Sequence, residues 1–276
     1  MQYLRSYFKK HVALTSEHGS WVFLFSPLII GLFAGHSWNR NAIYLLEAAL
    51  GGFLIRQPIT IIIKTLSGRR SKRDLPAARF WVLIYSLIGL LGVWGLVRNG
   101  FAFLLILAIP GVLVFTWHLH YVYQRAERRQ MEIEIVASGV LALAAPAGYW
   151  VGKGELHPDG WWLWLLIWLQ SASSIVHAYM RLRQRELGQA PSIKERIRIG
   201  QRALLYTSFN VLLVGVLSVT GILPSWLIIP YLLQWGETLW GTFRPAVGVK
   251  PNSIGFRQLA VSILFTILFI LAWNIL

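Results

Sequence analysis

The chain of 276 residues contains no cysteine and only two aspartates, Asp74 and Asp159. The absence of cysteine excludes disulfides and thiolate chemistry. Charged residues are also scarce, since they make up 13% of the chain, whereas a soluble protein carries about a quarter. Hydrophobic residues make up 56%, and the mean hydropathy is +0.56. This composition excludes an ordinary soluble domain and indicates a protein that folds in a lipid bilayer.

Apolar segments of the length that a helix needs to cross a bilayer, about 20 residues, recur along the chain. Loop-forming stretches such as "SGRRSKRDLP", "RNG" and "RPAVGVKPNS" separate them. We predict nine spans, at 19–38, 42–64, 79–98, 101–121, 132–152, 160–182, 203–222, 223–243 and 256–275. The first 18 residues are basic and mildly amphipathic and lack the apolar core of a signal peptide, so residues 1–18 are expected to form a cytoplasmic segment of the mature protein.

The distribution of positive charge predicts the orientation. The net charge is +15, and with nine spans 23 of the 26 Lys and Arg residues fall on one side of the membrane, the exceptions being Arg40, Arg98 and Lys153. By the positive-inside rule, the N-terminus is cytoplasmic, the C-terminus is outside, and 183–202 is a basic cytoplasmic loop. The charge is thus explained by topology and by anionic lipid headgroups, and no nucleic acid is expected. The predicted fold is an all-α, polytopic transmembrane helical bundle, with residues 1–276 in a single integral membrane domain.

Three predicted spans carry polar residues at helical spacing, so that each set lies on one helix face. The set in 42–64 is Arg56, Thr60 and Lys64. The set in 160–182 is Gln170, Ser174, His177 and Arg181, and the set in 223–243 is Gln234, Glu237, Gly241 and Arg244. Ionisable groups inside a membrane are costly, so each is a candidate for function.

All three sets lie in the predicted cytoplasmic half of their spans, the level at which "EHGSWVFLFSP" begins the first span. We therefore predict a cavity open to the cytoplasm. Its excess of cations favours an anionic headgroup, and its apolar wall favours an amphipathic small molecule. The candidate ligand-binding residues are Glu17, His18, Arg56, Lys64, His177, Arg181, Glu237 and Arg244.

Several of these candidates also have a purely structural interpretation, and the sequence leaves both open. Lys64 can extend to the membrane interface as an anchor. Glu237 can form an ion pair with an arginine between helices. Glu17 can belong to a helix cap in "TSEHG". His118 and His120 point in divergent directions on a helix, so we expect no metal site and no cofactor.

Several stretches together resemble the YwiC-like family of bacterial and cyanobacterial membrane proteins. They are "EHGSWVFLFSP", "RQPITIIIK", the arginine-rich segment after 182 and "ETLWGTFRPAVGVKPNSIGFRQ". The resemblance extends over essentially the whole chain. It implies a bacterial cytoplasmic or thylakoid membrane and no particular activity.

Nine spans with these termini also look like the UbiA-type intramembrane prenyltransferases, an analogy of architecture alone. Those enzymes bind a diphosphate through magnesium held by aspartate-rich motifs on cytoplasmic loops. Here Asp74 and Asp159 are predicted to lie on opposite sides of the membrane, and "RQP" stands at Arg56 in place of an acidic motif. Magnesium-dependent prenyl transfer is therefore not expected.

Three functions are compatible with these features. We favour a protein that binds or transports an anionic or amphipathic small molecule, because the cationic faces are predicted to converge. One alternative is an intramembrane enzyme that modifies a lipid or isoprenoid, with Glu17, His18 or Glu237 as acid or base. Another is an assembly or scaffold protein of a membrane complex, docking through "RLRQRELGQAPSIKERIRIGQR".

Overall fold

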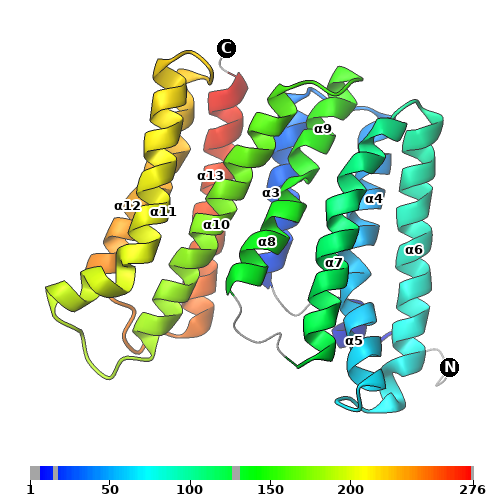
Figure 1. The fold of residues 1–276 in the computed structure, drawn as a ribbon, viewed down its shortest axis with the longest axis horizontal. Coiled ribbons are helices and arrows are strands. Elements are labelled where there is room, and N and C mark those ends of the chain that lie inside the picture. The colour runs from blue at the N-terminus through cyan, green and yellow to red at the C-terminus, as the bar shows by residue number, and fades with distance from the viewer. Residues whose placement is uncertain (1–6, 15–17, 126–130, 275–276) are drawn as a thin grey trace. The chain divides into compact units, whose positions relative to one another are not determined.

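The computed structural model describes residues 7–14, 18–125 and 131–274, and most of them are helical (Figure 1). No strand occurs within these ranges, which confirms the all-α prediction. In chain order the helices are α2 (Lys10–Ala13), α3 (His18–Ala34), α4 (Arg40–Leu54), α5 (Arg56–Leu66), η1 (Lys72–Asp74), α6 (Leu75–Arg98), η2 (Ala102–Leu107), α7 (Ala108–Tyr123), α8 (Met131–Ala142), α9 (Ala144–Lys153), α10 (Asp159–Arg185), α11 (Ile193–Val219), η3 (Ser225–Leu227), α12 (Ile228–Phe243) and α13 (Pro251–Asn274).

The chain folds into two compact units, residues 1–161 and 162–276. The first unit contains α2 to α9 and the first residues of α10, and the second contains the rest of α10 together with α11, α12 and α13. The boundary lies inside a continuous helix. That both units form the single membrane domain expected from the sequence stays a prediction.

Seven helical segments within the described ranges are long and apolar enough to cross a membrane: Arg40–Leu66, Lys72–Arg98, Ala102–Tyr123, Met131–Lys153, Asp159–Arg185, Ile193–Val219 and Pro251–Asn274. Each overlaps one of the nine predicted spans, which indicates a multi-pass integral membrane protein. The other two predicted spans contain the shorter helices α3 and α12, of 17 and 16 residues. The total of nine and the orientation of the termini stay predictions.

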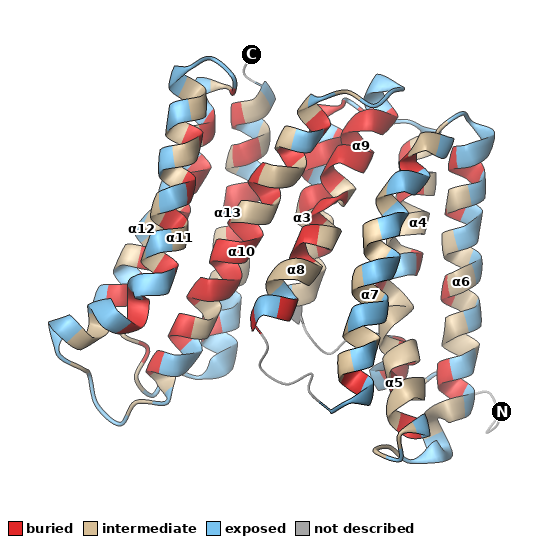
Figure 2. Ribbon diagram, viewed as in Figure 1, coloured by how far each residue is buried: buried red, intermediate tan, exposed pale blue. Residues whose placement is uncertain are grey.

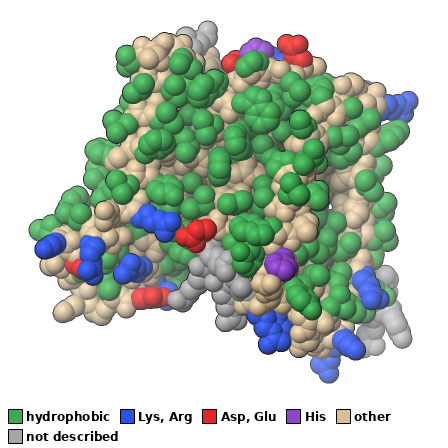
Figure 3. All heavy atoms as spheres, in the orientation of Figure 1, with side chains coloured by type: hydrophobic (Ala, Val, Ile, Leu, Met, Phe, Trp, Pro, Cys, Tyr) green, Lys and Arg blue, Asp and Glu red, His purple; other side chains and the backbone are tan. Residues whose placement is uncertain are grey.

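The outer surfaces of the helices are apolar, as expected for helices that contact lipid. In Figure 3 hydrophobic side chains cover most of the visible helical surface, and Lys and Arg side chains of the second unit gather near the adjoining ends of α10 and α11. Only 6% of the apolar stretch of the η2–α7 segment is buried, compared with 67% for that of α10. Figure 2 shows the same contrast between a largely exposed α7 and a largely buried α10.

In the first unit α4 and α6 pack with their backbones in close contact. A Cβ atom added to Gly51 on α4 would lie 2.6 Å from the Cα of Gly89 on α6, well inside van der Waals contact. A Cβ atom added to the adjacent Gly52 would meet nothing within 4 Å. Glycine at position 51 thus permits the close helix approach that is typical of membrane bundles.

The described segment before α3 packs against the same unit. Val12 in α2 is fully buried and belongs to an apolar cluster with Ile61, Ala77 and Ala78. The hydroxyl of Tyr85 donates to the carbonyl of Ala13 at 2.8 Å. The described part of the predicted amphipathic segment therefore buries its apolar face on α5 and α6.

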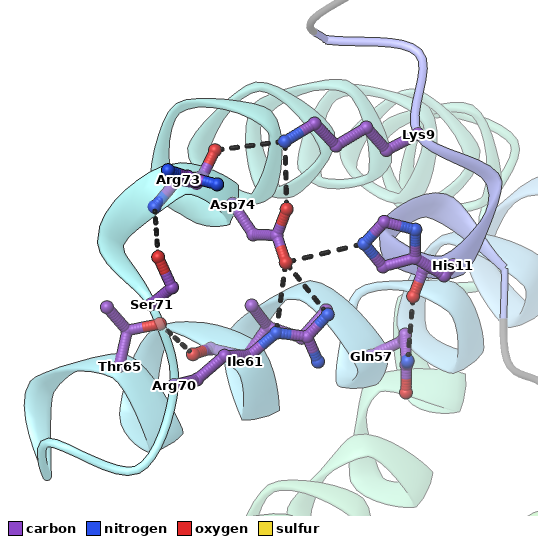
Figure 4. Close-up of polar contacts among 9 residues, drawn as sticks. All are labelled: Lys9, His11, Gln57, Ile61, Thr65, Arg70, Ser71, Arg73 and Asp74. Carbon is purple, nitrogen blue, oxygen red and sulfur yellow. Dashed lines mark hydrogen bonds and ion pairs between the residues drawn. The ribbon is translucent and has the colours of Figure 1, made fainter.

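The carboxylate of Asp74 contacts polar side chains of this segment (Figure 4). Its Oδ1 lies 2.9 Å from the Nζ of Lys9, and its Oδ2 lies 3.3 Å from the Nε2 of His11. The Nη2 of Arg70 donates to Oδ2 at 2.9 Å, and the Nε2 of Gln57 donates to the carbonyl of His11 at 3.2 Å. The side chain of Asp74 is 16% exposed, so its contacts are partly protected from screening. Asp74 is thus a structural anchor for the segment.

In the second unit α11 and α12 form a helical hairpin and α13 packs against α12. The predicted basic loop 183–202 is mostly helical, because α10 extends to Arg185 and α11 begins at Ile193. Arg196 on α11 donates through Nε to the carbonyl of Pro191 and through Nη1 to that of Phe243, both at 2.8 Å. These bonds tie the 186–192 connection to the end of α12.

Candidate functional site

The polar residues predicted to share a face in 160–182 do lie on one buried face of α10. Their exposed fractions are between 4% and 7%, for Gln170, Ser174, His177 and Arg181. Helix α12 approaches this face closely at Gly241, where an added Cβ atom would lie 2.8 Å from the Cε1 of His177. The small residue therefore lets the backbone of α12 cover the polar face of α10.

Arg181 uses one nitrogen of its guanidinium to close the end of α12. Its Nη1 donates to the carbonyls of Gly241 and Arg244, at 2.8 and 2.7 Å, and to the Oε1 of Gln184 at 2.9 Å. Carbonyls in the last turn of a helix have no partner within the helix, so these bonds cap α12. Within the described ranges, the Nε and Nη2 of Arg181 donate to no residue, and no carboxylate lies within ion-pair distance of it.

Glu237 on α12 and Arg257 on α13 form a two-point ion pair. The Nε of Arg257 lies 2.5 Å from the Oε1 of Glu237, and its Nη2 lies 2.7 Å from Oε2. The side chain of Glu237 is 14% exposed, and that of Arg257 is 46% exposed. The guanidinium carbon of Arg257 also lies 3.5 Å from the centroid of the Trp240 ring. This pair is the interhelical contact that the sequence left open for Glu237, with Arg257 as its partner.

A cavity of about 320 Å³ lies between α10, α12 and α13 in the second unit. Its polar lining includes Ser174, His177, Arg181, Gln234, Glu237 and Arg257. Its apolar lining includes Trp240, Val249, Ile254 and Val261. The volume is at the small end of the range for ligand pockets. Three of the predicted site residues, His177, Arg181 and Glu237, thus meet around one cavity.

Gln234 supplies an unused hydrogen-bond acceptor to this cavity. The residue is 6% exposed, and its Oε1 is the one buried side-chain nitrogen or oxygen in the described ranges without a hydrogen-bond partner. Leaving a buried polar atom unpaired costs about 1–3 kcal/mol. Gln258, which also lines the cavity, differs because its Nε2 donates to the carbonyl and the Oγ of Ser174, at 2.7 and 2.8 Å.

The remaining candidates are Arg244 in the second unit and the neighbouring residues Glu17 and His18. Arg244 has an exposed side chain and contributes its backbone carbonyl, through the bond from Arg181. Glu17 lies outside the described residues. His18 is the first residue of α3, but its side chain is likewise outside the description.

Arg56 and Lys64 belong to the first unit, in the short helix α5. The guanidinium carbon of Arg56, at the start of this helix, lies 5.4 Å from the ring centroid of Phe53. Lys64 is half-buried in the last turn. The cavity of the second unit is complete without either side chain, so a ligand site that includes them stays a prediction.

Sequence reasoning missed the contribution of α13. Arg257 and Gln258 line the cavity and bind Glu237 and Ser174, yet neither residue was among the candidates predicted from the sequence. A signal was present, since "NSIGFRQ" places two adjacent polar residues at the start of an otherwise apolar span. Trp240 was missed as well, although it lies three residues after Glu237 and therefore on the same face.

Comparison with known families shows that residues 14–149 match the family described as YwiC-like protein. This range lies in the first unit and contains both "EHGSWVFLFSP" and "RQPITIIIK" in full, together with α3 to α8 and most of α9. The two later stretches that carried the resemblance, and the cavity, lie outside it. Neither the comparison with curated proteins nor that with solved structures gave a significant match. Residues 14–149 thus match the YwiC-like family, which confirms the resemblance over this part of the chain.

Proposed function

We propose that this membrane protein binds a small anionic, amphipathic molecule in the cavity between α10, α12 and α13. The observation that carries the proposal is Arg181, which lines the cavity, is only 6% exposed and has no carboxylate within ion-pair distance in the described ranges. A buried charge without a counterion costs several kcal/mol. An anion in the cavity would supply the missing counterion.

The charges around the cavity support an anion over a cation. Two arginines, Arg181 and Arg257, line it, but the carboxylate of Glu237 already neutralises Arg257 through two bonds. One positive charge is left in excess. The free edge of Arg181, formed by Nε and Nη2, has the fork geometry that binds a carboxylate or phosphate through parallel hydrogen bonds.

The apolar lining supports an amphipathic ligand. Val249, Ile254 and Val261 present aliphatic surface to the same cavity that holds Arg181. Apolar walls with a few placed polar groups are typical of small-molecule sites. A ligand with an ionised end and an apolar body would satisfy both parts of the lining.

We also propose a location and an orientation for the protein, on the basis of its positive charge. We place the chain in a bacterial cytoplasmic or thylakoid membrane, with the cavity open to the cytoplasm and the exposed Lys and Arg side chains near the ends of α10 and α11 facing anionic lipid headgroups. Transport of the ligand would extend this proposal and would require a second state open to the other side.

Binding to the full chain purified in mild detergent tests the proposal. The probes are phenylpropionate and its uncharged and cationic counterparts, phenylpropanol and phenylpropylamine, measured by calorimetry and thermal shift. We expect the acid to bind at least about tenfold more tightly than the other two, because only the acid pairs with Arg181. Equal binding of the three probes, or binding of none, would reject the proposal.

Two variants locate the binding in the cavity. Glu237→Gln releases Arg257 from its partner, so affinity for phenylpropionate should rise by at least about fivefold. The matched control is Glu195→Gln, because Glu195 pairs with Arg198 on α11 at 2.8 Å and does not line the cavity. The same gain in both variants would mean that the acid responds to net charge and not to this site.

A further inference from the structure

We infer that the ligand of this cavity is an elongated monocarboxylate with a hydroxyl group at the end remote from its carboxylate, the hydroxyl donating to the Oε1 of Gln234. The inference rests on the proposed function, because it assumes that an anion occupies the free edge of Arg181. It adds a second point of recognition and with it the chemical class of the ligand.

The need for a donor follows from the hydrogen bonds inside the cavity. Two other side chains of the lining donate within the protein: the Oγ1 of Thr238 donates to the carbonyl of Gln234 at 3.0 Å, and the Nε2 of Gln258 donates to Ser174. The Oε1 of Gln234 has no partner within the described ranges, although the residue is 6% exposed. A hydroxyl donor from a ligand is the partner that this acceptor lacks.

The spacing of the two recognition points predicts an elongated ligand. The Nη1 of Arg181 bonds to the carbonyl of Gly241, so its guanidinium lies at the level of Gly241 on α12. Gln234 is seven residues earlier on the same helix, which corresponds to about 10 Å at 1.5 Å per residue. The carboxylate and the hydroxyl of the ligand are therefore expected at opposite ends of its apolar body.

The available charge favours a carboxylate over a phosphate. Arg181 is the one Lys or Arg of the cavity lining with no described carboxylate within ion-pair distance, since Glu237 is bound to Arg257. A single guanidinium edge balances a monoanion, whereas a phosphate near neutral pH carries between one and two negative charges, about −1.5 to −2 when it is a monoester. The carboxylate of Glu237 in the same lining would repel the additional charge.

Two matched pairs of probes test the inference on the full chain in mild detergent. The first pair is p-hydroxyphenylpropionate and phenylpropionate, and the second is ω-hydroxydecanoate and decanoate. We expect the hydroxylated member of at least one pair to bind about tenfold more tightly, the size of effect that one buried hydrogen bond produces. The pair that shows the preference distinguishes an aromatic acid from a fatty acid as the source of this chemistry.

Variants assign the preference to the amide. Gln234→Met keeps the length of the side chain and removes the acceptor, so the two members of the preferred pair should bind with equal affinity to this variant. Gln170→Met is the matched control, because Gln170 is equally buried in the same unit and is not part of the cavity lining. A preference that persists in Gln234→Met would overturn the assignment.

The outcomes separate this inference from the proposed function. If the wild-type protein binds the acids but prefers neither hydroxylated member, the inference is overturned and the anion site stands. If no acid binds, both are rejected. Because this comparison uses the wild-type protein, it decides the inference even where a variant fails to fold.

Discussion

The guanidinium of Arg257 stacks 3.5 Å from the ring centroid of Trp240 while its Nε and Nη2 bind both oxygens of Glu237. The contact joins α13 to two positions on the same face of α12. A stacked and doubly hydrogen-bonded arginine has little rotational freedom. It therefore fixes the pairing of the two helices at the rim of the cavity and also removes one cation from ligand binding.

Removing Arg257 should destabilise the second unit. In Arg257→Gln the carboxylate of Glu237, 14% exposed, has no ionic partner, and we expect the free energy of unfolding to fall by about 1–3 kcal/mol. Denaturation by SDS or heat of the ligand-free protein in mild detergent measures the effect. The double variant with Glu237→Gln should lose less than the sum of the single losses. Strict additivity would show that the two side chains do not interact.

Adding one methyl group at Gly241 should separate α12 from α10. In Gly241→Ala the new Cβ atom would lie 2.8 Å from the Cε1 of His177 and 3.3 Å from the Cδ of Arg181. We expect a loss of about 1–3 kcal/mol in unfolding free energy, from overpacking, and weaker binding of phenylpropionate. Gly236→Ala on the same helix is the control, because nothing lies within 4 Å of its added Cβ atom. Equal behaviour of the two variants would contradict the close approach.

A second glycine pair tests the packing of α4 against α6. Gly51→Ala would place Cβ 2.6 Å from backbone atoms of Gly89, so the helices must move apart, at a cost of about 2 kcal/mol or more. Gly52→Ala should be neutral or stabilising by up to about 1 kcal/mol, because its site is open and alanine favours the helix. Thermal unfolding of both variants gives the comparison. A neutral Gly51→Ala would show that the two helices are not in backbone contact.

Neutralising Asp74 should release the segment that precedes α3. Asp74→Asn weakens the ion pairs to Lys9 and Arg70 and the contact to His11, and amide hydrogen exchange of residues 9–14 should speed up about tenfold or more. Asp159→Asn is the control, because this carboxylate accepts from Tyr149 at 3.1 Å and is paired with His157. Unchanged exchange in Asp74→Asn would mean that the apolar contacts of Val12 hold the segment alone.

Properties that depend on a single helix could be predicted from the sequence. Spacings of three and four residues correctly placed His177 and Arg181 on one buried face of α10, because helix geometry alone decides which side chains share a face. Hydropathy located the long helices, because the length of a span is set by the thickness of the membrane.

Properties that depend on the pairing of helices could not be predicted. Glu237 was expected to have a cationic partner. Identifying Arg257 as that partner requires the alignment of α13 against α12. Side-chain packing and the 244–250 connection together determine this alignment. Whether the Oε1 of Gln234 has a hydrogen-bond partner depends on the side chains of the neighbouring helices. The position of Gln234 within α12 therefore does not predict that this atom lacks one.

The contact of Lys9 with Asp74 spans 65 residues of chain, and this sets an order of events during synthesis. Residues 9–13 leave the ribosome before α5 and α6, yet their binding surface on these helices is made only after the two helical segments that follow α3 have been inserted. Until then residues 9–13 have nothing to pack against. The docking of residues 9–13 must therefore follow the insertion of α5 and α6, and it marks the completion of that step.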